Sequence, residues 1–221
     1  WSRGLGDVYK RQLFSFEKRR NPNSQTNPSC IFIHPEKQET EGIKTRKLRL
    51  YESLKQGIML RKWKGTRRYV QNKSVGAILD GEKVDFQTLR NKYVTSKNNP
   101  NIQAWELETP KDIRAGGIRD LVKGYKSAMT NLKNGNITHF QFRFQKRKDD
   151  KSLEIPASAI KYEDGKLYIY KRYSPEHIRI SKDKKYLHNL EFKHDCRLSC
   201  EYGKWYLHVP VKYTVKTKKP K

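Results

Sequence analysis

The sequence has few cysteines and no long hydrophobic run. Its 221 residues include only Cys30, Cys196 and Cys200, too few for a disulfide framework and in keeping with a reducing intracellular setting. Apolar stretches span only a few residues, which excludes a membrane-crossing helix, and the N-terminus lacks a basic start followed by an apolar signal core. We therefore expect an intracellular protein with no membrane partner: nuclear in a eukaryote, otherwise in the cytoplasm or a virus-infected host cell.

Acidic residues are also scarce. Only 23 Asp and Glu oppose 49 Lys and Arg, which gives a formal net charge of +26. Self-repulsion of this size destabilises a compact chain, and a polyanionic partner is the usual compensation. The excess of positive charge lies after residue 42, in segments with the patterns of folded elements, so the sequence predicts a shaped nucleic-acid-binding surface.

Residues that could form a catalytic or metal centre are not evident. Metal-dependent phosphodiester cleavage needs several converging acids, whereas Asp149-Asp150 and Glu163-Asp164 lie in turn-like segments next to lysines. The histidines lack ligand spacing, and Cys196 and Cys200 have no second pair to complete a zinc site. No nucleotide-binding glycine loop or nucleophile elbow occurs. We predict no catalytic residue, no metal ligand and no cofactor in this chain.

The first 42 residues differ in texture from the rest. Trp1–Gln12 begins without Met and resembles a translated sequencing adapter, so we expect this string to be artefactual. Residues 13–42 are polar and are predicted to be disordered. Hydrophobic residues make up 34% of the chain, below the usual share of about 45–50%. A thin core rich in tyrosine and tryptophan is expected.

Helical patterns fill residues 52–135, after a basic strand over residues 43–51. Two helices are predicted over 52–63 and 67–79, separated at Lys64-Gly65 with Thr66 as N-cap, and a third over 85–93. A fourth helix is predicted to start with Thr109 as cap and Pro110 at the first helical position, and to end near Leu132. Gly116-Gly117 in this helix costs roughly 1 kcal/mol per glycine relative to alanine, which predicts a close approach by another helix or a backbone.

The hydrophobic period changes from 3.6 to 2 after residue 136. Residues 139–144 alternate with their phenylalanines predicted to face inward, and the final pair of strands meets at Tyr202-Gly203-Lys204 in a hairpin. Other short strands are predicted at 153–155, 160–162, 166–171 and 177–180, and the final pair spans 190–202 and 204–215. Consecutive short antiparallel strands favour a small barrel or sandwich. The predicted fold class is therefore α+β.

Basic and aromatic residues gather where the first two predicted helices meet. Cations there can contact phosphates, and Tyr69 can stack on bases, while Trp63 is expected in the core. The same spacing fits a helix-turn-helix reader of duplex DNA, as in a stand-alone regulator, and composition does not separate this from RNA binding. A structural RNA-binding protein of ribosomal type is a further alternative. We expect charge reversal at Arg67 and Arg68 to weaken RNA binding without unfolding the chain.

Five segments of the chain stand in a recognisable order: Lys44–Tyr51 (KTRKLRLY), Leu60–Lys73 (LRKWKGTRRYVQNK), Glu108–Lys126 (ETPKDIRAGGIRDLVKGYK), His139–Lys148 (HFQFRFQKRK) and Gly203–Val211 (GKWYLHVPV). This order resembles the OrfB/TnpB family, and in particular its eukaryotic or giant-virus branch, the Fanzor-like proteins. The resemblance covers about residues 43–215, and its third segment is the most specific.

The resemblance implies an RNA-guided DNA endonuclease of insertion sequences. Residues 43–51 and 136–215 would form its wedge domain, a small antiparallel barrel of oligonucleotide-binding type, and residues 52–135 an inserted helical recognition lobe. The implied partners are a guide RNA and a double-stranded DNA target, with base pairing supplying the sequence information. A RuvC-like nuclease domain would follow residues 216–221, beginning with Asp-Pro-Gly. Mg²⁺ and Zn²⁺ would be held only there, so we expect this part of the protein not to cut DNA.

We predict nucleic-acid contacts from the first strand, the helical lobe and the segment after it. The residues are Lys44, Arg46, Lys47, Arg49, Arg61, Lys62, Lys64, Arg67, Arg68, Tyr69, Asn72, Lys73, Lys111, Arg114, Arg119, Lys123, Lys126, Arg143, Lys146 and Arg147.

Overall fold

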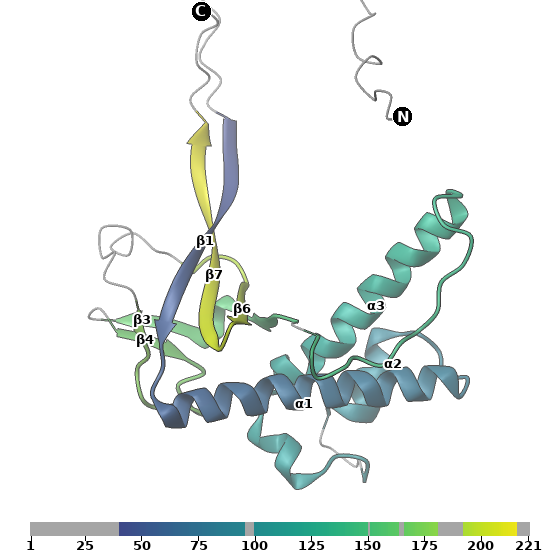
Figure 1. Ribbon diagram of the computed structural model, residues 1–221, viewed down its shortest axis with the longest axis horizontal. Helices are drawn as coiled ribbons and strands as arrows, with labels where there is room; N and C mark the ends of the chain where they lie inside the picture. Colours follow the sequence, from purple (N-terminus) through teal and green to yellow (C-terminus); the bar gives the residue numbers. More distant parts are fainter. Residues whose placement is uncertain (1–39, 96–99, 150, 164–165, 181–191, 216–221) are drawn as a thin grey trace, which may run out of the picture. The chain divides into compact units, whose positions relative to one another are not determined.

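The computed structural model describes residues 40–95, 100–149, 151–163, 166–180 and 192–215, and residues 39–221 belong to one compact unit. Its elements are β1 (Thr40–Tyr51), α1 (Leu54–Leu79), α2 (Phe86–Tyr93), the 3₁₀ turn η1 (Ala104–Glu108), α3 (Lys111–Lys133), β2 (Leu153–Ile155), the 3₁₀ turn η2 (Ala157–Ala159), β3 (Ile160–Glu163), β4 (Lys166–Ile169), β5 (Arg179–Ile180), β6 (Cys196–Glu201) and β7 (Lys204–Val215) (Figure 1). This mixture confirms the α+β class. The predicted N-terminal extension lies almost wholly outside the described residues, as do residues 216–221.

The strands form an open antiparallel sheet with the order β2-β6-β7-β1-β5, and β3 and β4 form a separate two-stranded sheet. β1 and β7 pair along most of their length, as Figure 1 shows. A single bridge between Leu167 and Ile178 connects the small sheet to the segment before β5. Within the described residues β2 and β5 remain edge strands, so the closed barrel is not confirmed. Over the same ranges, no helix has the length and apolar character needed to cross a bilayer.

The predicted hairpin between β6 and β7 is confirmed. Glu201 pairs with Lys204, which leaves a two-residue loop in which Tyr202 and Gly203 have φ values of 49° and 75°. Positive φ at both positions matches the two-residue turns whose twist suits antiparallel strands.

The predicted break between the first two helices is wrong, because α1 runs unbroken through Gly65. Thr66 does not cap a new helix; its hydroxyl donates to the Lys62 carbonyl (3.0 Å). A glycine in a helix costs only roughly 1 kcal/mol. Burial of Trp63 and Val70 on either side outweighs this cost, since a fully buried large side chain contributes about 1.5–3 kcal/mol.

The start of α3 also differs from the prediction. Pro110 is the N-cap residue. The Thr109 hydroxyl donates to Thr66 Oγ1 (2.9 Å) and does not accept from the exposed amides of its own helix. This buried hydrogen bond fastens the beginning of α3 to α1. The end of α3 at Lys133 agrees with the prediction, as does α2, whose N-cap Asp85 accepts from the Thr88 amide (2.9 Å).

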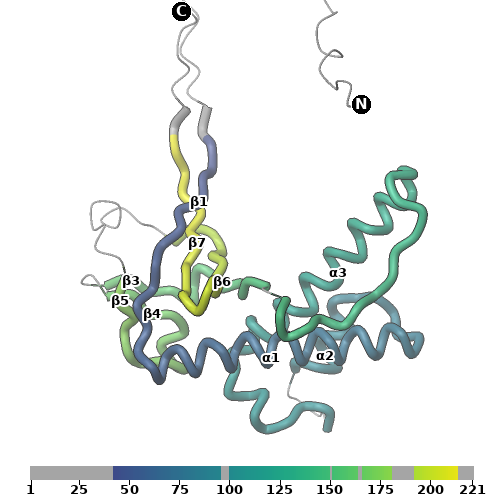
Figure 2. Tube along the Cα trace, in the orientation of Figure 1, coloured from purple at the N-terminus to yellow at the C-terminus, as the bar shows by residue number. Residues whose placement is uncertain are grey.

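The strand predicted over residues 139–144 is absent. Phe140 and Phe142 face inward as expected, but they pack on Tyr125 of α3, with ring centroids 5.9 and 5.8 Å away, while Phe144 is 55% exposed. Figure 2 follows this segment from the end of α3 back toward α1. The period of 2 thus reflects an extended segment packed on a helix instead of a strand in a sheet.

Two hydrophobic cores meet along α1. The first joins the sheets to the N-terminal half of α1 and to the start of α3, and Trp63, as expected, is fully buried in it. The second holds the C-terminal half of α1 together with α2, α3 and the partly buried Phe142. Because one helix supplies both cores, the helical and β parts of residues 39–221 share their hydrophobic interior.

The helices α1 and α3 approach each other closely at Gly117. A Cβ at this position would lie 2.8 Å from the Arg67 backbone carbonyl, and one at Gly116 would lie 3.9 Å from Glu154 Cβ in β2. The close approach predicted for this glycine pair is therefore confirmed, with a helix backbone on one side and the sheet on the other.

We predict that Gly117→Ala destabilises the protein by about 1–3 kcal/mol, since the methyl group would force apart two packed backbones. Gly124→Ala in the same helix is the control. Nothing lies within 4 Å of its Cβ position, so it should stabilise the protein by about 0.4–1 kcal/mol. Urea denaturation of both variants measures the difference, and equal shifts in midpoint would contradict the crossing geometry.

Candidate nucleic-acid interface

The side of α1 that faces away from both cores carries a continuous stripe of exposed and half-exposed residues. Its members lie three or four residues apart, with Tyr69 added directly after Arg68, which places them on one face of a helix. We call this face the outer stripe; it comprises Leu54, Ile58, Arg61, Gly65, Arg68 and Tyr69. Leu54 and Ile58 are 79% and 55% exposed. The side chains of Arg61 and Arg68 make no hydrogen bond or ion pair with any other residue that the structure describes.

Gly65 lies at the centre of the outer stripe, and its Cβ position faces open space, with no atom within 4 Å. Arg61 and Arg68 are about one helical turn away on either side. A phosphate group could therefore approach the bare helix backbone at Gly65 within reach of two long guanidinium side chains, which bind phosphate oxygens through paired hydrogen bonds. The fold itself gives no packing reason for a glycine here.

An aromatic pair borders the stripe. The Tyr69 ring lies 5.0 Å from that of Trp105 in η1, tilted by 59°, and the two residues are 38% and 40% exposed. Lys73 Nζ lies 5.1 Å from the Tyr69 ring. Exposed rings beside cations provide a surface on which bases stack without regard to sequence. Trp105 was not among the predicted contacts. The sequence feature that could have indicated it is a lone tryptophan in a polar segment.

Other predicted cations of α1 already have partners. Lys62 forms an ion pair with Glu108 of η1, and Lys73 donates to the Asn101 carbonyl (2.5 Å) and lies 3.5 Å from the buried Glu106 carboxylate. Lys64 is half-buried and has a partner of its own. These contacts hold η1 against α1 and so fix the position of Trp105.

Arg67 is not part of the outer stripe. It is only 2% exposed. One terminal nitrogen lies 2.5 Å from Asp120 of α3, and the other donates to Gln145 Oε1 (3.5 Å). A side chain enclosed in this way cannot reach a phosphate from its present position. We therefore revise its predicted role from nucleic-acid contact to structural ion pair.

Arg114 and Asn72 are likewise occupied inside the protein. Arg114 is 4% exposed and donates to the carbonyls of Thr109 (3.2 Å) and Val94 (3.3 Å); burial lowers the pKa of its guanidinium. Asn72 donates to the Gln145 carbonyl (3.0 Å) and accepts from the Gln145 amide (2.8 Å). Asn72 therefore clamps the segment after α3 onto α1.

This clamp brings three predicted cations to the side of α1. Arg143, Lys146 and Arg147 flank Gln145 and are exposed, and their side chains have no hydrogen-bond or ion-pair partner in the described part of the chain. On α3, Lys111, Lys123 and Lys126 are exposed and similarly unengaged within the described ranges. Arg119 differs, since its guanidinium lies 2.8 Å from Glu154 of β2.

The cations of β1 are held by the sheet. Lys47 lies 2.5 Å from Glu201 and 4.3 Å from the Tyr206 ring centroid, while Arg49 donates to the Trp205 carbonyl (3.0 Å). Lys44 is exposed, and its Nζ lies 5.1 Å from the Tyr213 ring. Arg46 is half-buried and also has a partner. Lys44 thus contacts a ring, whereas Lys47 and Arg49 are held by a carboxylate and a carbonyl.

His208 of β7 lies beside Lys47 in this sheet and was not predicted from the sequence. Its Nε2 lies 2.8 Å from Ser199 Oγ, and partial burial together with the charge of Lys47 lowers the pKa of the imidazole. The adjacent carboxylate, Glu201, is engaged with Lys47. The arrangement is a polar row on a sheet surface, and we assign no chemistry to it.

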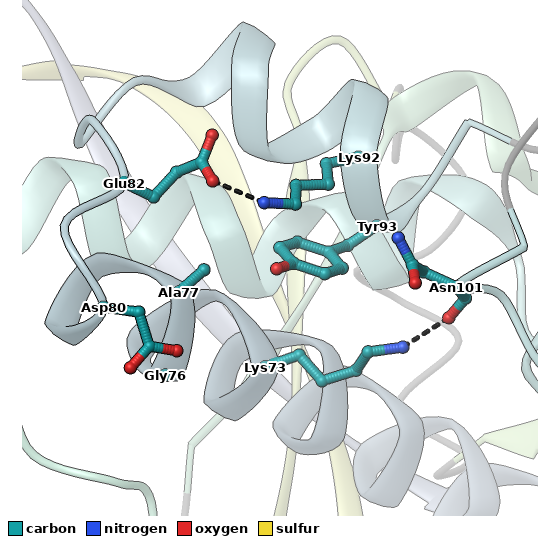
Figure 3. A pocket seen from close by; sticks show the side chains of 8 residues that line it. All are labelled: Lys73, Gly76, Ala77, Asp80, Glu82, Lys92, Tyr93 and Asn101. Atoms are coloured by element: carbon teal, nitrogen blue, oxygen red, sulfur yellow. Dashed lines mark hydrogen bonds and ion pairs between the residues drawn. The ribbon is translucent and has the colours of Figure 1, made fainter.

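A cavity of about 510 Å³ opens beside the C-terminal half of α1. Figure 3 shows Lys73 and Lys92 on opposite sides of the Tyr93 ring, with their ammonium nitrogens 5.5 and 5.7 Å from its centroid. Lys73 is bound to Asn101 and Lys92 to Glu82. Because both cations are paired and carboxylates line the wall, this cavity is a poor site for a phosphate.

Among the described residues, no three His, Cys, Asp or Glu side chains come together in a way that could hold a metal ion. Asp149 lies in a turn and accepts from the Lys146 amide (2.8 Å), while Asp150 and Asp164 lie outside the described residues. Burial raises the pKa of the Cys196 thiol to about 11, which keeps it protonated at neutral pH. We derive no metal-dependent step from these residues.

These observations define a basic α+β chain with an unengaged cationic stripe on its longest helix. No established family profile matches the chain. It is 31% identical over 196 residues to a protein of Paramecium bursaria Chlorella virus 1 named "putative transposase". The match covers 81% of this chain but 44% of the viral protein, so the chain spans less than half of its relative's length. The similarity supports a transposase-like family.

We predict that Arg67→Gln lowers the free energy of unfolding by roughly 1.5–3 kcal/mol, because Asp120 loses a charged hydrogen bond from Arg67 and keeps only Arg197, which lies 3.5 Å from its other oxygen. Arg68→Gln, one residue along α1, should change it by no more than about 0.5 kcal/mol. Chemical denaturation of the two variants checks the contrast. A stable Arg67→Gln protein would show that the ion pair does not hold the helices together.

Proposed function

We propose that this chain is the nucleic-acid-binding part of a TnpB-like, RNA-guided DNA endonuclease, in which it holds guide RNA and target DNA and does not itself cut. The observation that carries the proposal is that most of this chain is similar to a viral protein named as a putative transposase. The order of the five sequence segments supports the TnpB type within that class. The net charge of +26 supports a polyanionic partner.

The geometry of α1 supports recognition of a backbone and not of a base sequence. Arg61, Gly65 and Arg68 offer charge and close approach, but no rigid set of donors and acceptors aimed at base edges. Direct readout of duplex DNA depends on such sets. In RNA-guided recognition the protein binds shape and phosphates while base pairing reads the sequence. The outer stripe has the properties needed to bind phosphates in this way.

The helix-turn-helix alternative loses its structural basis. That motif needs two helices joined by a turn, so that the second can enter the major groove. Residues 54–79 instead form one helix, and its buried side supplies both hydrophobic cores. Little of the second predicted helix therefore remains available to contact base pairs.

The proposed function predicts tighter binding to structured RNA than to duplex DNA of equal length, with log K falling linearly as log salt rises. The double variant Arg61→Glu/Arg68→Glu should lower the RNA salt slope by about 0.7–0.9 for each phosphate that the protein no longer neutralises. Fluorescence anisotropy over a salt series provides the measurement.

The control is Lys83→Glu/Lys204→Glu, which makes the same charge change at two exposed residues outside the proposed contacts, one before α2 and one at the β6–β7 turn. It should leave the slope nearly unchanged. An equal effect of both double variants would mean that only net charge matters. A wild-type chain that binds no RNA in dilute buffer would contradict the proposed function outright.

A further inference from the structure

A second cavity, of about 290 Å³, lies where the end of β1 meets the start of α1 and the strands β4 and β5. It is smaller than the roughly 300–1,000 Å³ of pockets that enclose drug-sized ligands. None of its lining residues was predicted from the sequence as a contact, since they come from segments far apart in the chain. They include Tyr51, Ser53, Tyr168, His177 and Arg179.

Hydrogen bonds hold the walls of this cavity in place. Gln56, which is 4% exposed, donates through Nε2 to the carbonyls of Glu176 (3.4 Å) and His177 (3.1 Å). Its Oε1 accepts from the Ser53 amide (2.9 Å), and its own amide donates to Ser53 Oγ (3.3 Å). The start of α1 and the segment before β5 are thereby fixed to each other, so the cavity is preformed.

Aromatic rings, Arg179 and the Glu176 carboxylate line the cavity, and this carboxylate lies 3.8 Å from Lys55 Nζ. Tyr51 is 53% exposed, and the Tyr168 ring packs edge to face against His177, with centroids 6.3 Å apart. Lys171 Nζ lies 4.9 Å from the Tyr168 ring. Arg179 pairs with Tyr51 across β5 and β1, is exposed, and has no hydrogen bond or ion pair from its side chain to the rest of the described chain.

We propose that this cavity receives the base of one unpaired nucleotide in a bound single strand, with Arg179 and Lys171 near its phosphates. Rings that flank a small opening favour a flat heterocycle, and unstacked bases of single strands bind to aromatic side chains in this way. Duplex bases are stacked on each other and cannot enter. The proposal rests on the proposed function, because it assigns a subsite for a strand that the chain binds.

The test compares the binding affinities of the wild type, Tyr51→Ala and Tyr168→Ala for three fluorescein-labelled probes. The probes are a single-stranded RNA, a single-stranded DNA of the same sequence, and the RNA duplex. Each is about 15 nucleotides long, near the upper end of single-strand site sizes. Each variant should bind at least one single strand about 5- to 150-fold more weakly, the range that corresponds to about 1–3 kcal/mol per stacked base. The strand that loses affinity identifies the source of the base. Duplex affinity and the salt slope should not change, since no cation is removed.

Tyr202→Ala is the matched control, because Tyr202 stands fully exposed at the β6–β7 turn, and Tyr168→Phe should restore single-strand binding. Equal losses on duplex and single strands would indicate damage to the fold and overturn the subsite. Unchanged single-strand affinity in both alanine variants would also overturn it while leaving the proposed function intact. Failure of the wild type to bind any of the three probes would instead reject both proposals.

Discussion

The fold depends on the crossing of α1 and α3, where two helix backbones nearly touch. Gly117 permits the approach because it carries no side chain toward the Arg67 carbonyl. The Arg67 guanidinium then turns inward to Asp120, whose second oxygen lies 3.5 Å from Arg197 of β6. One carboxylate therefore connects both long helices and the sheet. Breaking a pair of this kind is costly because the remaining charge is left largely without water.

This crossing determines which charges remain for a ligand. The inner side of α1 is used by the two cores and by Arg67. The α1 cations that have no partner among the described residues, Arg61 and Arg68, therefore lie on its outer side. Several cations that were predicted to contact nucleic acid instead bind carboxylates or carbonyls and stabilise the fold. The sequence alone could not separate these cations from those that remain available to a ligand. Side chains that need not break an internal pair can neutralise phosphates at lower cost, which favours Arg61 and Arg68 over Lys47 or Lys62.

Local patterns predicted most elements, but not which surfaces they share. The β6–β7 hairpin, α2, the end of α3 and the close approach at Gly116-Gly117 were all predictable, because turn chemistry, caps and glycine cost are local properties. The break at Gly65 was wrong because core burial on both sides outweighs one glycine. Phe140 and Phe142 alternate with polar residues although they form no strand, because both rings pack on the helix α3. The burial of Arg67 could not be predicted from local patterns, because its ion-pair partner Asp120 lies 53 residues away in the sequence.

The central claim is that the outer side of α1 and its aromatic border form the interface with RNA. Hydroxyl-radical footprinting of the full chain, with and without bound structured RNA, is the most direct test. It compares aromatic side chains, which react with hydroxyl radicals at comparable rates. Oxidation of Tyr69 and Trp105 should fall on binding, while oxidation of Tyr202 at the hairpin turn should not. Protection of Tyr202 with Tyr69 and Trp105 unchanged would contradict it.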